Sequence, residues 1–149
     1  MSGAIMTTDT YPKLSVTSVS IGGQDVRIAG FVKGSGMIAP DMATMLGFIF
    51  TDARIALPVL QKLTREIADK TFNCITVDSD TSTSDTVIVF ATGSAGPEIA
   101  DAASPEADAF AAALYDVMRD MAHQVVRDGA GLSKFVQITI TGAENDDAA

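Results

Sequence analysis

The sequence contains little positive charge, a single cysteine and no tryptophan. Ten lysine and arginine residues stand against 19 acidic residues, which gives a net charge of −9 at pH 7. Nucleic acids and anionic membranes are bound by clusters of Lys and Arg, so this composition argues against both as partners. Cys74 cannot form an internal disulfide, and a lone cysteine is typical of a reducing compartment. We therefore expect a cytoplasmic protein.

Long hydrophobic runs and targeting signals are also missing. No apolar stretch approaches the roughly 20 residues that cross a bilayer, and the start, MSGAIMTTDTYPK, lacks the basic flank and apolar core of a secretory signal. The chain does have a hydrophobic content of 47%, which is enough for one compact domain over residues 1–149. Only residues 144–149 are expected to form a disordered tail.

Short segments with alternating or β-branched side chains predict the strands. Residues 14–20 and 26–32 alternate between apolar and polar, and Gly22-Gly23 between them predicts a tight hairpin turn. Similar β-type runs predict further strands at 46–53, 72–77, 86–92 and 135–141. Gly93, Gly96 and Pro97 predict a chain break after the fifth of these strands.

Two segments carry helical spacing. Apolar residues recur every three or four positions over about 55–70, and a second helix is predicted from Ser104-Pro105-Glu106 to about Gly129. The stripe of the second helix consists of Phe110, Leu114, Val117, Met118, Met121 and Val125. Because strands and helices do not alternate strictly, their order predicts an α+β fold, with a mixed or antiparallel sheet and helices packed on it.

Most polar groups have simple structural interpretations. The loop Gly34-Ser35-Gly36 lacks the residues of a phosphate-binding loop, and residues 78–85 lack the glycine and glutamate of a calcium loop, so no metal site is predicted. His123 is interpreted as structural or solvated, and Cys74 as a small core side chain. Thr44, taken from its spacing alone, is a packing residue.

One long segment is far more specific. The string KGSGMIAPDMATMLGFIFTDA at 33–53 closely resembles the self-cleavage segment of the ornithine acetyltransferase (glutamate N-acetyltransferase) family, which is cut between the Ala and Thr of an ATML motif. Three more segments agree in order and spacing, namely AIMTTDTYPK at 4–13, TFNCITVDSDTSTSDTV at 71–87 and RDGAGLSKFVQITITGA at 127–143. The resemblance implies the layered fold that this family shares with N-terminal-nucleophile aminopeptidases.

The resemblance also implies a mechanism and a site. Thr44 would attack the carbonyl carbon of Ala43, and hydrolysis of the ester would leave Thr44 as a new N-terminus. Its amine, which titrates near pH 8, could then take the proton of its own hydroxyl. In this arginine-biosynthesis reaction, Thr44 carries acetyl from N-acetylornithine to glutamate, with acetyl-CoA as an alternative donor and no other cofactor. The implied substrate contacts are Thr7, Lys33 and Thr44, where lysine suits a substrate carboxylate.

Several family features are missing from this sequence. Ala130 stands where relatives carry a substrate-binding glutamate, and the segments that supply the oxyanion hole and complete the pocket have no counterpart here. The chain is therefore expected to be a central fragment, whose partners are the missing segments or a second copy in a homo-oligomer. Two alternatives stay open: an inactive remnant that pairs with another chain through exposed sheet edges, and a related aminopeptidase.

Overall fold

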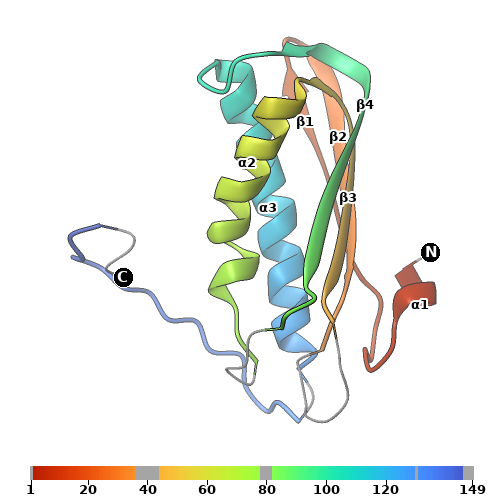
Figure 1. Ribbon diagram of the computed structural model, residues 1–149, viewed down its shortest axis with the longest axis vertical. Coiled ribbons are helices and arrows are strands. Elements are labelled where there is room, and N and C mark those ends of the chain that lie inside the picture. Colours follow the sequence, from red (N-terminus) through yellow and green to blue (C-terminus); the bar gives the residue numbers. More distant parts are fainter. Residues whose placement is uncertain (1, 36–43, 78–81, 130, 146–149) are drawn as a thin grey trace.

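The computed structural model describes residues 2–35, 44–77, 82–129 and 131–145 (Figure 1). Its elements, in chain order, are α1 (Ser2–Ile5), β1 (Lys13–Ile21), β2 (Gln24–Lys33), β3 (Leu46–Ile55), α2 (Leu57–Asp69), the 3₁₀ helix η1 (Phe72–Cys74), β4 (Thr86–Ile99) and α3 (Pro105–Arg127). Within this described part, no helix combines the length and apolar character that crossing a membrane requires.

The four strands form one sheet in the order β1-β2-β3-β4. The pairs β1–β2 and β2–β3 are antiparallel, whereas β3 and β4 run parallel and are connected through α2. Figure 1 shows α2 and α3 side by side on one face of the sheet, and α1 beyond the opposite face. The α+β fold with a mixed sheet is therefore confirmed.

The first hairpin follows from its two glycines. Ile21 pairs with Gln24, so the loop consists of Gly22 and Gly23 alone, with φ of 58° and 78°. A two-residue turn with both φ values positive matches the right-handed twist of the flanking strands, and glycine adopts it without steric cost. At Gly22 a Cβ would also lie 2.9 Å from Cγ of Pro97, so β4 crosses close to this turn.

The core lies between the sheet and the two long helices. α3 begins after Ser104, whose hydroxyl accepts a hydrogen bond from the Ala107 N–H at 3.1 Å, as an N-cap does. The whole predicted stripe of α3 is buried. It packs on a set of inward-facing strand residues that includes Ile21, Val26, Ile28, Val32, Ile49 and Ala53. The helical period of α3 and the alternation of the strands thus direct apolar side chains into the same layer, from the helix side and from the sheet side.

The opposite face of the sheet carries a second apolar set, which neither α2 nor α3 covers. We call this set the aromatic face: Leu14, Val16, Ala29, Phe31, Phe48, Phe50, Ile88 and Phe90. Its rings form a continuous row, with centroid distances of 5.5 Å for Phe31–Phe48 and 5.1 Å for Phe50–Phe90. Val16 is 67% exposed and Phe90 44% exposed, so this face remains largely open to solvent.

Two predictions are wrong: the strand at 72–77 and the chain break at the glycines that follow residue 92. Residues 72–77 contain no strand; Phe72–Cys74 forms η1, because the Thr71 hydroxyl bonds the Ile67 carbonyl and the Cys74 N–H bonds the Thr71 carbonyl. These local bonds extend the end of α2. β4 also does not break at its glycines. Gly93 and Gly96 have φ of 71° and 75° and accompany irregularities in the β3–β4 register, so they form bulges in an edge strand that tolerates Pro97.

The predicted last strand at 135–141 is wrong as well. These residues pair with no strand of the described chain and are exposed, with Ile138 at 82%. Alternation gives a segment the side-chain pattern of a strand, but the backbone needs a neighbouring edge to pair with. The predicted tail at 144–149 lies mostly outside the described residues.

Candidate functional site

Lys33 and Thr44 lie near one end of the sheet, where β2 ends and β3 begins. Lys33, the last residue of β2, pairs with Leu46, the first residue of β3. The chain therefore leaves the sheet after β2 and rejoins it at β3 at the same end of the sheet. Thr44 is half-buried and lies two residues before Leu46. Ala43 lies outside the described residues, as does Ala130.

Two of the three expected substrate contacts touch each other. The Lys33 ammonium donates a hydrogen bond to the Thr7 hydroxyl at 3.4 Å, across 26 residues of sequence. Lys33 is buried at 6% exposure, whereas Thr7 is exposed. Thr44 forms no hydrogen bond with another residue of the described chain. The structure thus brings Thr7 and Lys33 together and leaves the Thr44 hydroxyl without a protein partner there.

The segment that carries Thr44 is held from both sides. The Met45 N–H donates to Oδ1 of Asp85 at 2.8 Å, and the Thr86 N–H donates to the Met45 carbonyl at 3.0 Å. Asp85, interpreted from sequence as part of a polar loop, therefore anchors the start of β3. On the other side Gly34 has φ of 148°, and a Cβ there would lie 3.4 Å from the Met45 side chain. Met45, which follows Thr44, therefore lies beside the Lys33–Gly34 corner.

A buried ionic cluster lies behind this corner. The Lys13 ammonium lies 2.5 Å from Oδ1 of Asp9 and 2.5 Å from Oδ2 of Asp128. Burial acts to raise the pKa of Asp9, but hydrogen bonds from Gly34 N–H, the Lys13 ammonium and Thr7 N–H outweigh burial and hold that pKa below its usual value. Asp128 behaves alike: burial raises its pKa, and Lys13 and Thr10 more than reverse the effect.

Sequence reasoning missed these supporting residues. Asp9 and Lys13 stood inside the quoted string AIMTTDTYPK and Asp128 inside RDGAGLSK, so the resemblance contained a signal, but no local pattern links two strings so far apart. Ser35 was also missed as a buried group; its hydroxyl lies 2.6 Å from that of Thr8.

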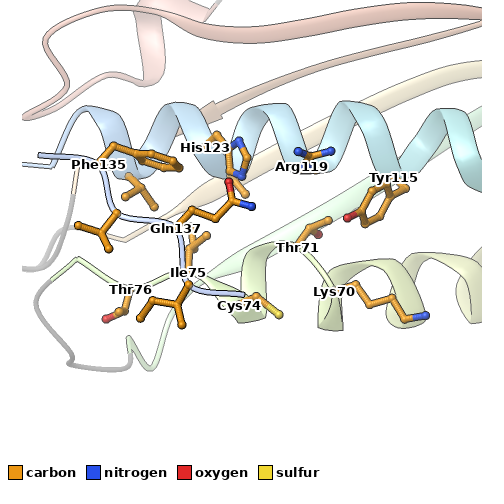
Figure 2. Close-up of a pocket in the computed structure, with 14 residues that line it drawn as sticks. Lys70, Thr71, Cys74, Ile75, Thr76, Tyr115, Arg119, His123, Phe135 and Gln137 are labelled. Atoms are coloured by element: carbon orange, nitrogen blue, oxygen red, sulfur yellow. The ribbon is translucent and has the colours of Figure 1, made fainter. Parts of the chain in front are cut away.

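A separate open cleft of about 400 Å³ lies on the outer side of α3 (Figure 2). Figure 2 shows Tyr115, Arg119 and His123 projecting from α3, with Phe135 and Gln137 of the C-terminal segment lying across from them. None of Thr7, Lys33 and Thr44 lines this cleft. This cleft is therefore separate from the residues that the resemblance implies.

Two sequence interpretations concern residues of this cleft. His123 packs edge-on against the Phe135 ring at 5.3 Å, and its pKa is lowered by burial and by the charges of Arg119 and Arg127. The interpretation of Cys74 as a core side chain is wrong: Cys74 is exposed on η1 and its Sγ donates to the Asp69 carbonyl at 3.0 Å. Among the described residues, no group of His, Cys, Asp or Glu is arranged to hold a metal ion.

Comparisons with known proteins show the family of this chain. The ArgJ family matches residues 1–149. The chain is 59% identical to the arginine biosynthesis bifunctional protein ArgJ of Rhizobium meliloti (strain 1021), over 98% of this chain and 36% of the relative. It is 53% identical to the protein of the same name from Zymomonas mobilis, over 100% of this chain and 37% of the relative.

A solved structure supports the fold. The crystal structure of arginine biosynthesis bifunctional protein ArgJ from Bacillus halodurans superposes with a TM-score of 0.56 at 41% identity, over 60% of this chain and 42% of that one. As the coverage of the two curated relatives shows, the chain spans little more than a third of their length. Because the family matches along the whole sequence, this chain belongs to the ArgJ family.

Proposed function

We propose that this chain carries the self-cleavage site and part of the substrate pocket of an arginine-biosynthesis acetyltransferase. The observation that carries the proposal is the Lys33–Thr7 contact at the corner where the Thr44 segment enters the sheet. The names of the relatives and the family match support the same reaction. We place the protein in the cytoplasm on the basis of its biosynthetic role and lone cysteine.

The first chemical step would be cleavage before Thr44. The Thr44 hydroxyl attacks the carbonyl carbon of Ala43, the C–N bond breaks, and the proton of the hydroxyl moves to the nitrogen. This step already frees the Thr44 amine, and water then hydrolyses the ester to free the Ala43 carboxylate and the Thr44 hydroxyl. That amine titrates near pH 8, so a neutral fraction is available to act as base for the hydroxyl of the same residue.

The second stage would be acetyl transfer in two half-reactions. The Thr44 hydroxyl takes acetyl from N-acetylornithine and releases ornithine; the α-amine of glutamate then attacks the acyl-threonine and leaves as N-acetylglutamate. Acetyl-CoA could serve as an alternative donor, and no other cofactor enters the reaction. Lys33 suits the substrate carboxylate, because a carboxylate could take over the hydrogen bond that its ammonium now gives to Thr7.

A second candidate function is supported by the aromatic face. An exposed row of rings runs across β2, β3 and β4, and monomeric soluble proteins rarely expose large contiguous apolar patches. We propose that this face is covered by another part of a longer chain or by a second copy. In isolation the chain would then act as an interaction fragment, with little turnover of its own.

Intact-mass analysis of the purified chain tests the catalytic proposal. Wild type should separate into residues 1–43 and 44–149, whereas Thr44→Ala should remain whole. Thr86→Ala is the matched control, because it removes another threonine hydroxyl at the same end of the sheet, where Thr86 pairs with Leu46. An uncut wild type, or cleavage that persists in Thr44→Ala, would leave the interaction fragment as the better description.

A further inference from the structure

Lys13 is the most deeply buried charged residue of the described chain. It is the first residue of β1, and its side chain is fully covered, between the carboxylates of Asp9 and Asp128. A lysine is almost never buried without a partner, because desolvation of its ammonium is costly. Two carboxylates around one ammonium leave a net negative charge, so each must be stabilised further by hydrogen bonds.

The additional hydrogen bonds of Asp9 end on the two segments that carry Thr7 and Lys33. One oxygen of Asp9 accepts the Gly34 N–H at 2.8 Å, and the other accepts the Thr7 N–H at 3.2 Å. Gly34 directly follows Lys33 in the chain. A single carboxylate thereby connects the backbone at position 7 to the backbone beside position 33. This link sets how far apart the Lys33 ammonium and the Thr7 hydroxyl can lie.

Asp128 makes the corresponding link to the end of α3. It accepts the Thr10 N–H at 2.9 Å and also the Thr10 hydroxyl. It is the C-cap residue of α3 and precedes position 130 by two residues. The Lys13 ammonium is thus the common point between the N-terminal segment, the end of β2 and the end of α3.

Stability alone does not explain this cluster. The cost of removing charges from water largely offsets the attraction in a buried ion pair, and well-packed apolar residues often replace such a pair without loss. What apolar residues cannot replace are the directed hydrogen bonds to the backbone at positions 7, 10 and 34. The main effect of the cluster is therefore to hold the backbone at positions 7, 10 and 34 in place.

We infer that Lys13 is a positioning residue, which fixes Thr7 and Lys33 relative to each other by holding Asp9 and Asp128 in place. The inference has one functional consequence: substrate binding depends on Lys13, although Lys13 does not touch the substrate. This consequence rests on the proposed function. Its structural part, the local ordering of positions 7–10 and 34, can be measured without any substrate.

The experiment compares amide hydrogen exchange in wild type, Lys13→Met and Lys13→Arg, each as the full chain. Lys13→Met should accelerate exchange at Thr10 and Gly34 by about tenfold or more, while the amides of the β1–β2 ladder near the Gly22-Gly23 turn keep their protection. Lys13→Arg should recover part of the protection, because a guanidinium can bond both carboxylates. Lys62→Met is the matched control, since Lys62 is exposed and its ion pair with Glu66 spans 3.8 Å on the surface of α2.

The outcomes separate the inference from the proposed function. Unchanged exchange at Thr10 and Gly34, or uniform acceleration of all amides, would overturn the positioning role; the second result would reveal a purely global effect. Calorimetry with N-acetylornithine then tests the consequence, and Lys13→Met should weaken binding by about tenfold. If wild type itself binds no N-acetylornithine while the local exchange effect is present, the positioning role stands and the proposed function fails.

Discussion

Gly30 lies in the middle of β2, on the side of the strand that faces α3. A Cβ at this position would lie 2.8 Å from Sδ of Met121 and 3.2 Å from Cγ1 of Ile49. Met121 is completely buried, so it has little room to move aside. The absence of a side chain at position 30 therefore determines how closely helix and sheet pack.

We expect Gly30→Ala to lower the free energy of unfolding by about 1–3 kcal/mol, because the added methyl group overpacks the core. Urea denaturation measures this change. Gly47→Ala is the control: it also adds a methyl group to a buried strand glycine, but its nearest neighbour, Cγ2 of Val87, would lie at an ordinary 3.4 Å. A neutral result for Gly30→Ala would show that Met121 moves aside without cost.

The long helix α3 is hydrogen-bonded to the segment that leads into β1. Gln124 of α3 exchanges two hydrogen bonds with the backbone of Leu14, and the Tyr11 hydroxyl donates to the Gln124 carbonyl at 2.9 Å. Together with the Lys13–Asp128 contact, these bonds attach residues 10–14 along the last turns of α3. This attachment holds the N-terminal segment of the candidate site against the rest of the fold.

The ionic part of this attachment predicts a specific response to acid. The pKa values of Asp9 and Asp128 lie below their usual value in the folded chain, against the opposing effect of burial. Their contribution to stability is therefore complete above the unfolded pKa of about 3.9 and is lost as the pH falls through the lower folded values. In Lys13→Met this acid-side slope should flatten, because the ammonium that lowers both pKa values is gone.

Denaturant midpoints measured between about pH 6 and about pH 2 test this expectation. Asp116→Asn, which removes an exposed carboxylate from α3, should keep the wild-type slope. Equal slopes in wild type and Lys13→Met would mean that the cluster does not control acid stability.

At the scale of the whole molecule, the two faces of the sheet differ in what covers them. One face is covered by α2 and α3 (Figure 1), and the side chains of the aromatic face on the other side are exposed to solvent. The segment at 135–141 is a second exposed apolar feature, with a strand-like pattern but no pairing to any strand among the residues that the structure describes. Both features are surfaces that another chain segment could cover.

We therefore expect the isolated chain to self-associate through the aromatic face. Phe50→Lys places a charge in the middle of this face and should shift the protein toward monomer in sedimentation velocity. Ser18→Lys is the control, because Ser18 is exposed on the same side of β1 but beyond the aromatic row. A wild type that remains monomeric, or a Phe50→Lys variant that associates as before, would exclude this interface.

Much of the architecture could be predicted from sequence where the signal is local. The Gly22-Gly23 turn, the Ser104 cap and the apolar stripe of α3 each follow from residues a few positions apart, and all three were confirmed. The errors arose where a local pattern was ambiguous. Residues 72–77 have β-type side chains, but Phe72–Cys74 forms a 3₁₀ turn in which the Cys74 N–H bonds the Thr71 carbonyl, and the glycines of β4 form bulges instead of a break.

The sequence by itself determined the periodic elements and, through the string around Thr44, the family. Only the tertiary structure decided which distant residues meet. Lys13 and Asp128 are separated by 115 positions and Thr7 and Lys33 by 26, and no spacing rule connects either pair. The physical reason is that helical and strand periods are fixed by the backbone of each segment, whereas long-range contacts depend on which faces remain to be buried and which polar groups remain to be paired.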